Sequence, residues 1–173
     1  MGGCRPPVRG PADVLTMELI LWRHAEAAPG EPDSARPLTD HGRSQAQVMA
    51  RWLAPRLPPD LRLVVSPARR AQETALTLAR SFETIEAAAP GCDVATFLRI
   101  VGWPDGERPV LVIGHQPTLG EVAAQLIDGQ QSSWRIGTGA VWWLRGKRRK
   151  VRDKAELLLA LEPEILEREG SGH

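Results

Sequence analysis

The chain has 173 residues, of which 42% are hydrophobic and 25% are charged, and its formal net charge is +1. This length fits a single domain with a sizeable core, while the near-neutral charge gives no general attraction to nucleic acid or to membrane surfaces. Since no apolar stretch approaches the roughly 20 residues that span a bilayer, and two cysteines are too few for a disulfide framework, we expect a cytoplasmic protein whose partners include neither nucleic acid nor a membrane.

The two ends of the chain differ in composition from its middle. Residues 1–16 are rich in glycine and proline and have no apolar core, so they predict a disordered extension and not a secretory signal. Residues 167–173 are mostly polar and predict a frayed tail. We therefore expect one folded domain over residues 17–166.

Predicted strands alternate with predicted helices along this domain. Short apolar runs predict strands, which are expected at 17–22, 61–65, 84–87, 110–113, 139–144 and 155–161. Apolar residues at a spacing of three and four predict helices, which are expected at 41–53, 67–82, 94–101 and 118–127. Thr39 or Asp40 is expected to cap the first helix and Asp93 the third, because these side chains accept hydrogen bonds from free backbone N–H groups.

The last two predicted strands flank the basic residues 145–150, which predict the turn of a hairpin. Strands that alternate with helices, followed by a terminal hairpin, predict a three-layer α/β/α sandwich with a mostly parallel sheet. On the first hairpin strand, the adjacent Trp142 and Trp143 are expected to point to opposite faces of that sheet.

Two histidines each follow a short apolar run. Arg23 and His24 come after the first predicted strand, and His115 comes after the fourth. Between them, Arg70 belongs to a Ser-Pro-Ala-Arg-Arg segment that begins at Ser66, after the second strand. Since open α/β sheets bind ligands at the carboxyl ends of their strands, two imidazoles and at least two guanidiniums are expected at one edge. This set suits the capture and transfer of a phosphoryl group.

The motifs Arg-His-Ala, Ser-Pro-x-x-Arg and Gly-His, in this order and each after a predicted strand, resemble those of the histidine phosphatase superfamily. The segment Arg-Pro-Leu-Thr at 36–39 is similar to that of its small bacterial phosphohistidine phosphatases. The resemblance spans roughly residues 17–161 and implies a phosphoglycerate-mutase-like fold, with a mixed six-stranded sheet and helices on both faces. One departure is Ala25, which stands where the family usually has glycine.

The candidate catalytic residues are His24, His115, Arg23 and Arg70. His24 is expected to attack phosphorus and to carry the phosphoryl group as phosphohistidine. Arg23 and Arg70 would clamp phosphoryl oxygens, whereas Arg69 points about 100° away on a helix and is expected to be solvated. A protonated His115 would donate to a phosphoryl oxygen as charge builds up in the transition state. Because neither histidine has a nearby ligand cluster, we expect no metal.

The expected leaving group follows from the carboxylates of the chain. Many members of the broader family use a carboxylic acid from the middle of the chain to protonate a leaving alkoxide. Here Glu83, Glu86 and Asp93 match no familiar motif, and Asp93 is better explained as a helix cap. A phosphohistidine has no such need, since its imidazole leaves readily once the ring is protonated. The resemblance therefore implies a phosphohistidine phosphatase that acts on a signalling protein, such as a histidine-containing phosphotransfer domain.

Two alternatives stay open. The first is a small-molecule phosphomonoesterase on the same site, with Glu86 or Asp93 as its acid. The second is a catalytically silent module that binds phosphorylated groups, although binding alone would not need a nucleophile. The expected partner is thus a phosphorylated protein or a small phosphorylated substrate, with no cofactor. No oligomeric state follows from the sequence, with which a monomer is compatible.

Overall fold

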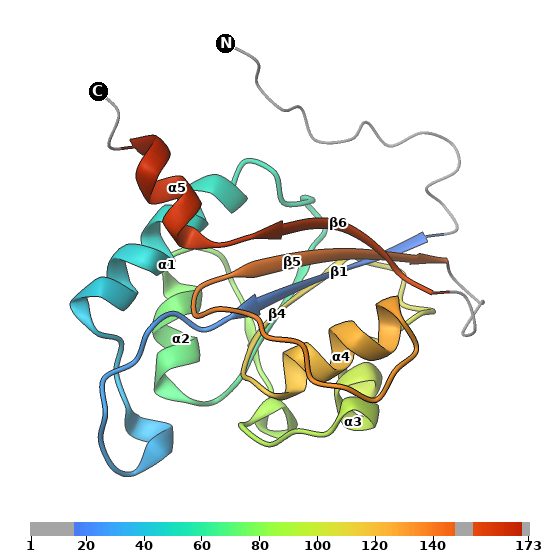
Figure 1. Cartoon of the computed structure of the whole chain (residues 1–173), viewed down its shortest axis with the longest axis horizontal. Coiled ribbons are helices and arrows are strands. Elements are labelled where there is room, and N and C mark those ends of the chain that lie inside the picture. Colours follow the sequence, from blue (N-terminus) through green and yellow to red (C-terminus); the bar gives the residue numbers. More distant parts are fainter. Residues whose placement is uncertain (1–15, 148–153, 171–173) are drawn as a thin grey trace.

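The computed structural model describes residues 16–147 and 154–170. Within these ranges, six strands form one mixed sheet in the order β3-β2-β4-β1-β5-β6 (Figure 1). They are β1 (Thr16–Arg23), β2 (Arg62–Val65), β3 (Glu83–Thr84), β4 (Val110–Gly114), β5 (Val141–Lys147) and β6 (Glu156–Leu161). The pairs β1–β4, β4–β2 and β2–β3 are parallel, whereas β5 is antiparallel to both β1 and β6. The predicted mostly parallel sheet with a terminal hairpin is confirmed.

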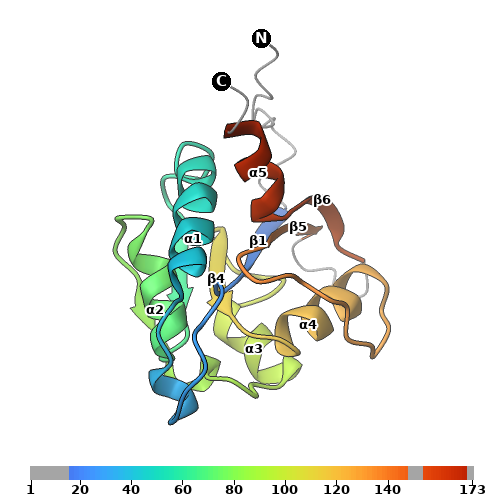
Figure 2. The same ribbon diagram turned by 60° about the vertical axis from the view of Figure 1, so that its left-hand side comes forward.

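Helices cover both faces of the sheet. Figure 2 shows α1 and α2 on one side of the strands and α3 and α4 on the other. The helices are α1 (Asp40–Leu53), α2 (Arg69–Leu76), α3 (Val94–Val101), α4 (Thr118–Ile127) and α5 (Pro163–Gly170), with short 3-10 turns η2 (Asp33–Ala35) and η3 (Glu86–Ala88). None of these described helices has the length and hydrophobicity of a membrane-spanning segment. This arrangement is the predicted three-layer sandwich.

The core lies on both sides of the central strand β1. Leu19 and Leu21 pack with the apolar faces of α3 and α4, whereas Ile20 and Trp22 pack with those of α1 and α2. All four side chains are fully buried, because successive residues of a strand point to opposite faces and both faces of this sheet are covered.

The hairpin strand β5 follows the same alternation. Trp142 packs against the α3–α4 side of the core and Trp143 against the α1–α2 side, so the prediction of opposite faces is confirmed. The Trp143 indole also donates a hydrogen bond of 3.0 Å to a carboxylate oxygen of Glu18.

Helix caps are placed largely as expected. Thr39 caps α1, because its hydroxyl accepts a hydrogen bond of 2.9 Å from the backbone N–H of Gly42. Asp93 caps α3 through a bond of 2.9 Å from the N–H of Thr96. Both caps satisfy backbone donors that the first turn of a helix leaves free.

Helix α2 is shorter than the predicted 67–82. It ends at Leu76. The N–H of Leu78 then donates to the carbonyl of Ala75, three residues earlier instead of the four of an α-helix, at 3.1 Å. Ala79 then adopts a left-handed conformation with φ of 50°, which a continuing right-handed helix does not allow.

The C-terminal end also differs from the expectation. Helix α5 covers residues 167–170, which were assigned to a frayed tail, and its buried Leu166 packs against the α1–α2 side of the core. Of the predicted strand at 84–87, only Thr84 belongs to β3, because the chain turns into η3 at Glu86. Two predicted boundaries are wrong, because Thr16, expected in the extension, begins β1, and residues 145–147 of the expected turn 145–150 belong to β5. The rest of the expected extension, residues 148–150 of the expected turn and residues 171–173 of the tail lie outside the described residues.

The strand pairing brings the motifs together. Arg23, the last residue of β1, lies opposite Gly114, the last residue of β4. His24 and His115 therefore leave neighbouring strands at the same edge of the sheet. β2 pairs with β4 on its other side, so Ser66 also leaves the sheet there.

Candidate active site

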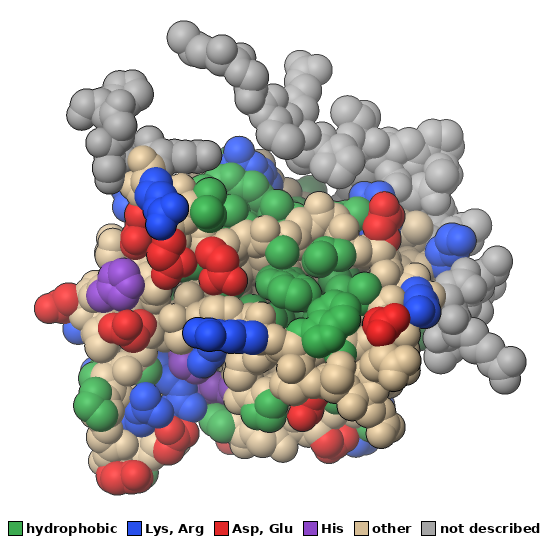
Figure 3. Space-filling view, viewed as in Figure 1, with side chains coloured by type: hydrophobic (Ala, Val, Ile, Leu, Met, Phe, Trp, Pro, Cys, Tyr) green, Lys and Arg blue, Asp and Glu red, His purple; other side chains and the backbone are tan. Residues whose placement is uncertain are grey.

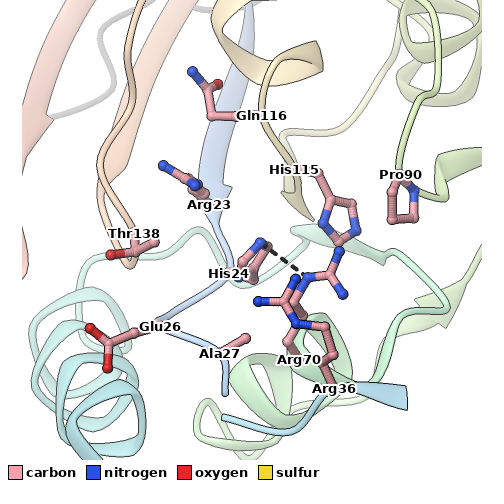
Figure 4. A pocket seen from close by; sticks show the side chains of 10 residues that line it. All are labelled: Arg23, His24, Glu26, Ala27, Arg36, Arg70, Pro90, His115, Gln116 and Thr138. Carbon is pink, nitrogen blue, oxygen red and sulfur yellow. Dashed lines mark hydrogen bonds between the residues drawn. The ribbon is translucent and has the colours of Figure 1, made fainter. Parts of the chain in front are cut away.

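A pocket lies at this carboxyl edge of the sheet (Figure 4). Its lining comes from residues far apart in the sequence, namely Arg23, His24, Glu26, Ala27, Arg36, Arg70, Pro90, His115, Gln116 and Thr138. In the space-filling view, histidine side chains are recessed among basic side chains at the lower left of the face shown (Figure 3). The cavity volume of about 280 Å³ is at the small end for ligand sites. It suits a phosphoryl group with part of its leaving group.

The four residues predicted for the site, His24, His115, Arg23 and Arg70, all line this pocket. The two imidazole centroids are 5.0 Å apart and their planes are inclined by 51°. Two guanidiniums and two imidazoles thus lie around one small volume, although several strands and helices separate His24 from His115 in the sequence.

The hydrogen bonds of His24 define which ring nitrogen is available. Its Nδ1 lies 2.8 Å from the carbonyl oxygen of Ala25, which can only accept, so Nδ1 carries the proton. Its Nε2 accepts a bond of 3.2 Å from Nε of Arg70. The lone pair of the neutral imidazole is therefore on Nε2, and this nitrogen is turned toward the arginine side of the pocket (Figure 4).

The surroundings also keep His24 neutral. Burial lowers its pKa to about 4, against the opposing hydrogen bond to the Ala25 carbonyl, and the positive charges of Arg70, Arg23 and Arg36 act in the same direction as burial. At pH 7 the ring is neutral, with its proton on Nδ1 and a free lone pair on Nε2, which is the form that can attack phosphorus.

His115 differs from its expected protonated form. Burial, together with the neighbouring His24 and Arg70, lowers its pKa to about 3. Its Nε2 lies 2.6 Å from the hydroxyl oxygen of Ser66, and no hydrogen-bond partner for its buried Nδ1 is found among the described residues. The imidazole is neutral at pH 7 in this site, although the charge of Asp33 opposes the lowering, and the negative charge of a bound phosphoryl group would favour its protonation further.

Ser66 connects the segment before α2 with His115, although no side chain caps α2 itself. Its hydroxyl accepts a bond of 3.3 Å from the N–H of Ala68 at the start of α2 and also touches His115. The sequence signal was its position as the first residue of the Ser-Pro-x-x-Arg motif, directly after a buried strand.

The two predicted arginines are held from different elements. Arg23 donates from Nη1 to the carbonyl of Ile136 at 2.8 Å, and burial lowers its pKa. Arg70, in the first turn of α2, is only 5% exposed. Its neighbour Arg69 is exposed and forms an ion pair of 2.7 Å with Glu73 outside the pocket. The predicted distinction between Arg70 and Arg69 agrees with these positions.

Sequence reasoning missed two charged residues of the lining. Arg36 belongs to the Arg-Pro-Leu-Thr segment, which had only served to support the family resemblance. Glu26 follows His24 by two residues, whereas the family resemblance points to carboxylates in the middle of the chain. Its Oε1 accepts a bond of 2.6 Å from the hydroxyl of Thr39.

The mid-chain carboxylates Glu83, Glu86 and Asp93, of which the last two are the candidate acids for an ester substrate, are not part of the lining. Asp93 is occupied with the cap of α3, and Glu83 forms an ion pair of 2.9 Å with Arg62. Glu86 lies in the exposed part of η3. The candidate residues for the phosphomonoesterase alternative are therefore placed outside the pocket, and Glu26 is the carboxylate that the fold brings there.

Among the described residues, no group of three or more His, Cys, Asp and Glu side chains is placed so that it could hold a metal ion. The lining instead combines three guanidiniums with two imidazoles. Guanidinium groups bind the oxygens of phosphate with two parallel hydrogen bonds, so the chemistry of the pocket favours a phosphorylated ligand.

Comparison with known sequences gives two results. Residues 19–89 match the family model of the histidine phosphatase superfamily, branch 1. The phosphohistidine phosphatase SixA of Escherichia coli strain K12 is 34% identical over 124 residues, which cover 66% of this chain and 76% of that protein.

Comparison with solved structures agrees. A SixA structure from Nakamurella multipartitia superimposes with a TM-score of 0.73 and 28% identity, and covers 86% of this chain and 96% of its own. The structure of the protein histidine phosphatase SixA complexed with tungstate gives a TM-score of 0.72 and 27% identity, with 87% and 99% coverage. The expected fold family is confirmed.

Proposed function

The chain belongs to the histidine phosphatase superfamily, and from this we propose that it is a phosphohistidine phosphatase whose substrate is a phosphorylated histidine on a protein. The observation that carries the proposal is the neutral imidazole of His24, with the lone pair of Nε2 in a pocket of guanidiniums. A histidine-containing phosphotransfer domain is the kind of protein that presents such a group.

In the proposed reaction, Nε2 of His24 forms a bond to phosphorus while the phosphorus–nitrogen bond of the substrate breaks. The leaving imidazole takes its proton from solvent. Arg23, Arg70 and His115 bind the phosphoryl oxygens, where charge is spread in the transition state. Water then attacks the phosphohistidine on His24, inorganic phosphate departs, and the imidazole returns to its starting form.

The proposed setting is the cytoplasm, because two cysteines among 173 residues are too few for the disulfide framework of a small exported domain. The near-neutral net charge of +1 gives no reason to propose a nucleic acid or membrane partner. The recognition of the substrate protein is therefore assigned to the phosphoryl group and the surface around the pocket.

The experiment that tests this function compares turnover of two substrates under the same conditions. One is a histidine-containing phosphotransfer domain that carries phosphohistidine, and the other is p-nitrophenyl phosphate. We expect kcat/KM to be at least about 10²-fold higher for the phosphoprotein, because an ester needs a positioned proton donor. A preference for the ester would support the phosphomonoesterase alternative, and phosphate binding without turnover of either substrate would support the silent module.

Glu26 is the carboxylate that must be tested as a proton donor. We expect Glu26→Gln to leave turnover of the phosphoprotein within about 3-fold of the parent, because solvent protonates an imidazole leaving group and the glutamine oxygen can still accept from Thr39. Turnover of both substrates is measured for this variant and for Glu86→Gln, which lies outside the pocket. A loss of about 10²-fold on both substrates in Glu26→Gln alone would assign a general acid to this position.

A further inference from the structure

A carboxylate joins two of the pocket arginines from the outside. Asp33, in the loop turn η2, has Oδ2 at 3.0 Å from Nη2 of Arg70 and Oδ1 at 2.9 Å from Nη1 of Arg36. The backbone carbonyl of Asp33 also accepts a bond of 2.7 Å from Nη1 of Arg70. One residue thus makes three contacts with two guanidiniums.

Each of these guanidiniums also donates a hydrogen bond from its Nε. Nε of Arg70 donates to Nε2 of His24, and Nε of Arg36 donates to the carbonyl of Ala28 at 2.8 Å. Figure 4 shows the two guanidiniums next to each other and close to His24 and His115. The orientation of both groups is therefore fixed before any ligand binds.

Two neighbouring guanidiniums repel each other, and a negative charge beside them offsets this repulsion. Asp33 supplies that charge: the hydrogen bonds from Arg36 and Arg70 lower the pKa of its carboxyl group, so it is ionised at pH 7. Its side chain is 53% exposed, whereas that of Arg70 is 6% exposed. The carboxylate thus lies on the solvent side of the pair and is absent from the pocket lining, to which both arginines belong.

We infer that Asp33 is a positioning residue, which holds Arg70 and Arg36 as a pair aimed at the phosphoryl group, and that Arg36 is a third guanidinium of the phosphoryl site. This inference rests on the proposed function, because it takes the pocket as the place where a phosphoryl group binds. Asp33 does not touch the reacting atoms and acts only through the two arginines. Each arginine keeps N–H groups that Asp33 does not use, since a guanidinium has five.

The test measures binding of inorganic phosphate by calorimetry and turnover of p-nitrophenyl phosphate and of the phosphoprotein. Asp33→Ala is expected to weaken phosphate binding by about 10- to 100-fold, the range for loss of charged hydrogen bonds. Asp33→Asn, which keeps one acceptor, is expected to lie between Asp33→Ala and the parent. Glu31→Ala removes an exposed acidic residue of the same loop and is expected to bind phosphate like the parent.

A double-mutant cycle separates positioning from a general structural role. If Asp33 acts through the arginines, Asp33→Ala must weaken phosphate binding less in an Arg36→Ala background than in the parent, because part of what it orients is already gone. Additive effects would overturn the inference. Tighter phosphate binding by Asp33→Ala or Asp33→Asn would also overturn it, since the carboxylate would then merely compete with phosphate.

The result can be read separately from the proposed function. Phosphate binding is the same measurement whichever phosphorylated substrate the protein prefers, so a failure on the phosphoprotein leaves the Asp33 comparison intact. Thermal unfolding is followed for each variant, and Asp33→Asn serves as the decisive variant if Asp33→Ala does not fold. Unchanged phosphate affinity in a folded Asp33→Asn and an Asp33→Ala that also binds like the parent would overturn the inference.

Discussion

His24→Ala is expected to reduce turnover of the phosphoprotein by at least about 10⁴-fold, because the variant has no atom that can form the covalent intermediate. The backbone N–H of His24 bonds to the carbonyl of Gly114 at 3.1 Å, and alanine keeps this contact. We therefore expect the variant to fold, and its thermal unfolding transition should remain cooperative. Turnover is measured in the steady state, and the thermal unfolding transition is measured by scanning calorimetry.

The intermediate itself can be detected. Parent enzyme mixed with substrate labelled in its phosphoryl group and denatured in alkali should carry a label that alkali preserves and acid removes, and peptide mapping should place it on His24. His41→Ala changes an exposed histidine in the first turn of α1 and should retain both turnover and label. A label on another residue, or near-parental turnover in His24→Ala, would exclude His24 as the nucleophile.

Most of the fold could be predicted because its elements have strong local patterns. The buried strands β1 and β4 are continuous apolar runs, and their positions within one or two residues follow from that pattern alone. Helix α5 was missed although Pro163 at its first position and Glu164 in its first turn are typical helix-start signals. The residues after Leu166 are mostly polar and therefore predicted a frayed tail. Only the packing of Leu166 on the core shows why the helix forms.

The same division applies to the candidate site. His24, His115 and Arg23 could be identified because they lie at or directly after strand ends, whose place at the sheet edge is a property of the fold class. Arg36 and Asp33 come from a loop with three prolines nearby. Such a loop has no local periodicity from which its path relative to the pocket could be predicted. Their approach to the pocket is set by tertiary contacts, such as the bond from Arg70 to the Asp33 carbonyl.

The protonation states of the two site histidines could not be predicted from the sequence. A sequence gives the types of neighbouring groups but not the degree of burial, and burial is the largest cause of the lowered pKa of both His24 and His115. The neutral form suits a nucleophile, so the prediction for His24 is compatible with its surroundings. The protonated form expected for His115 is not, unless phosphoryl binding supplies the compensating charge.

Arg70→Ala is expected to lose about 2–4 kcal/mol of transition-state stabilisation, by analogy with removal of an oxyanion-stabilising donor. This corresponds to a fall in kcat/KM of about 30- to 10³-fold. Three contacts would be removed together: the bond to Nε2 of His24, the pair with Asp33, and the proposed binding of phosphoryl oxygens. The measurement is kcat and KM on the phosphoprotein, because the loss of a contact that strengthens in the transition state lowers kcat and not only affinity.

Two further variants decide whether the activity depends on the geometry of the Arg70 guanidinium or only on a positive charge in this part of the chain. Arg69→Ala removes an equal charge one residue away, and since Arg69 pairs with Glu73 outside the pocket, kcat/KM should stay within about 3-fold of the parent. Arg70→Lys keeps the charge but cannot reach His24 and both acceptors of Asp33 with one planar fork, so it should resemble Arg70→Ala more than the parent. If Arg69→Ala is the more damaging change, or Arg70→Lys is fully active, the phosphoryl group does not depend on the buried guanidinium at the start of α2.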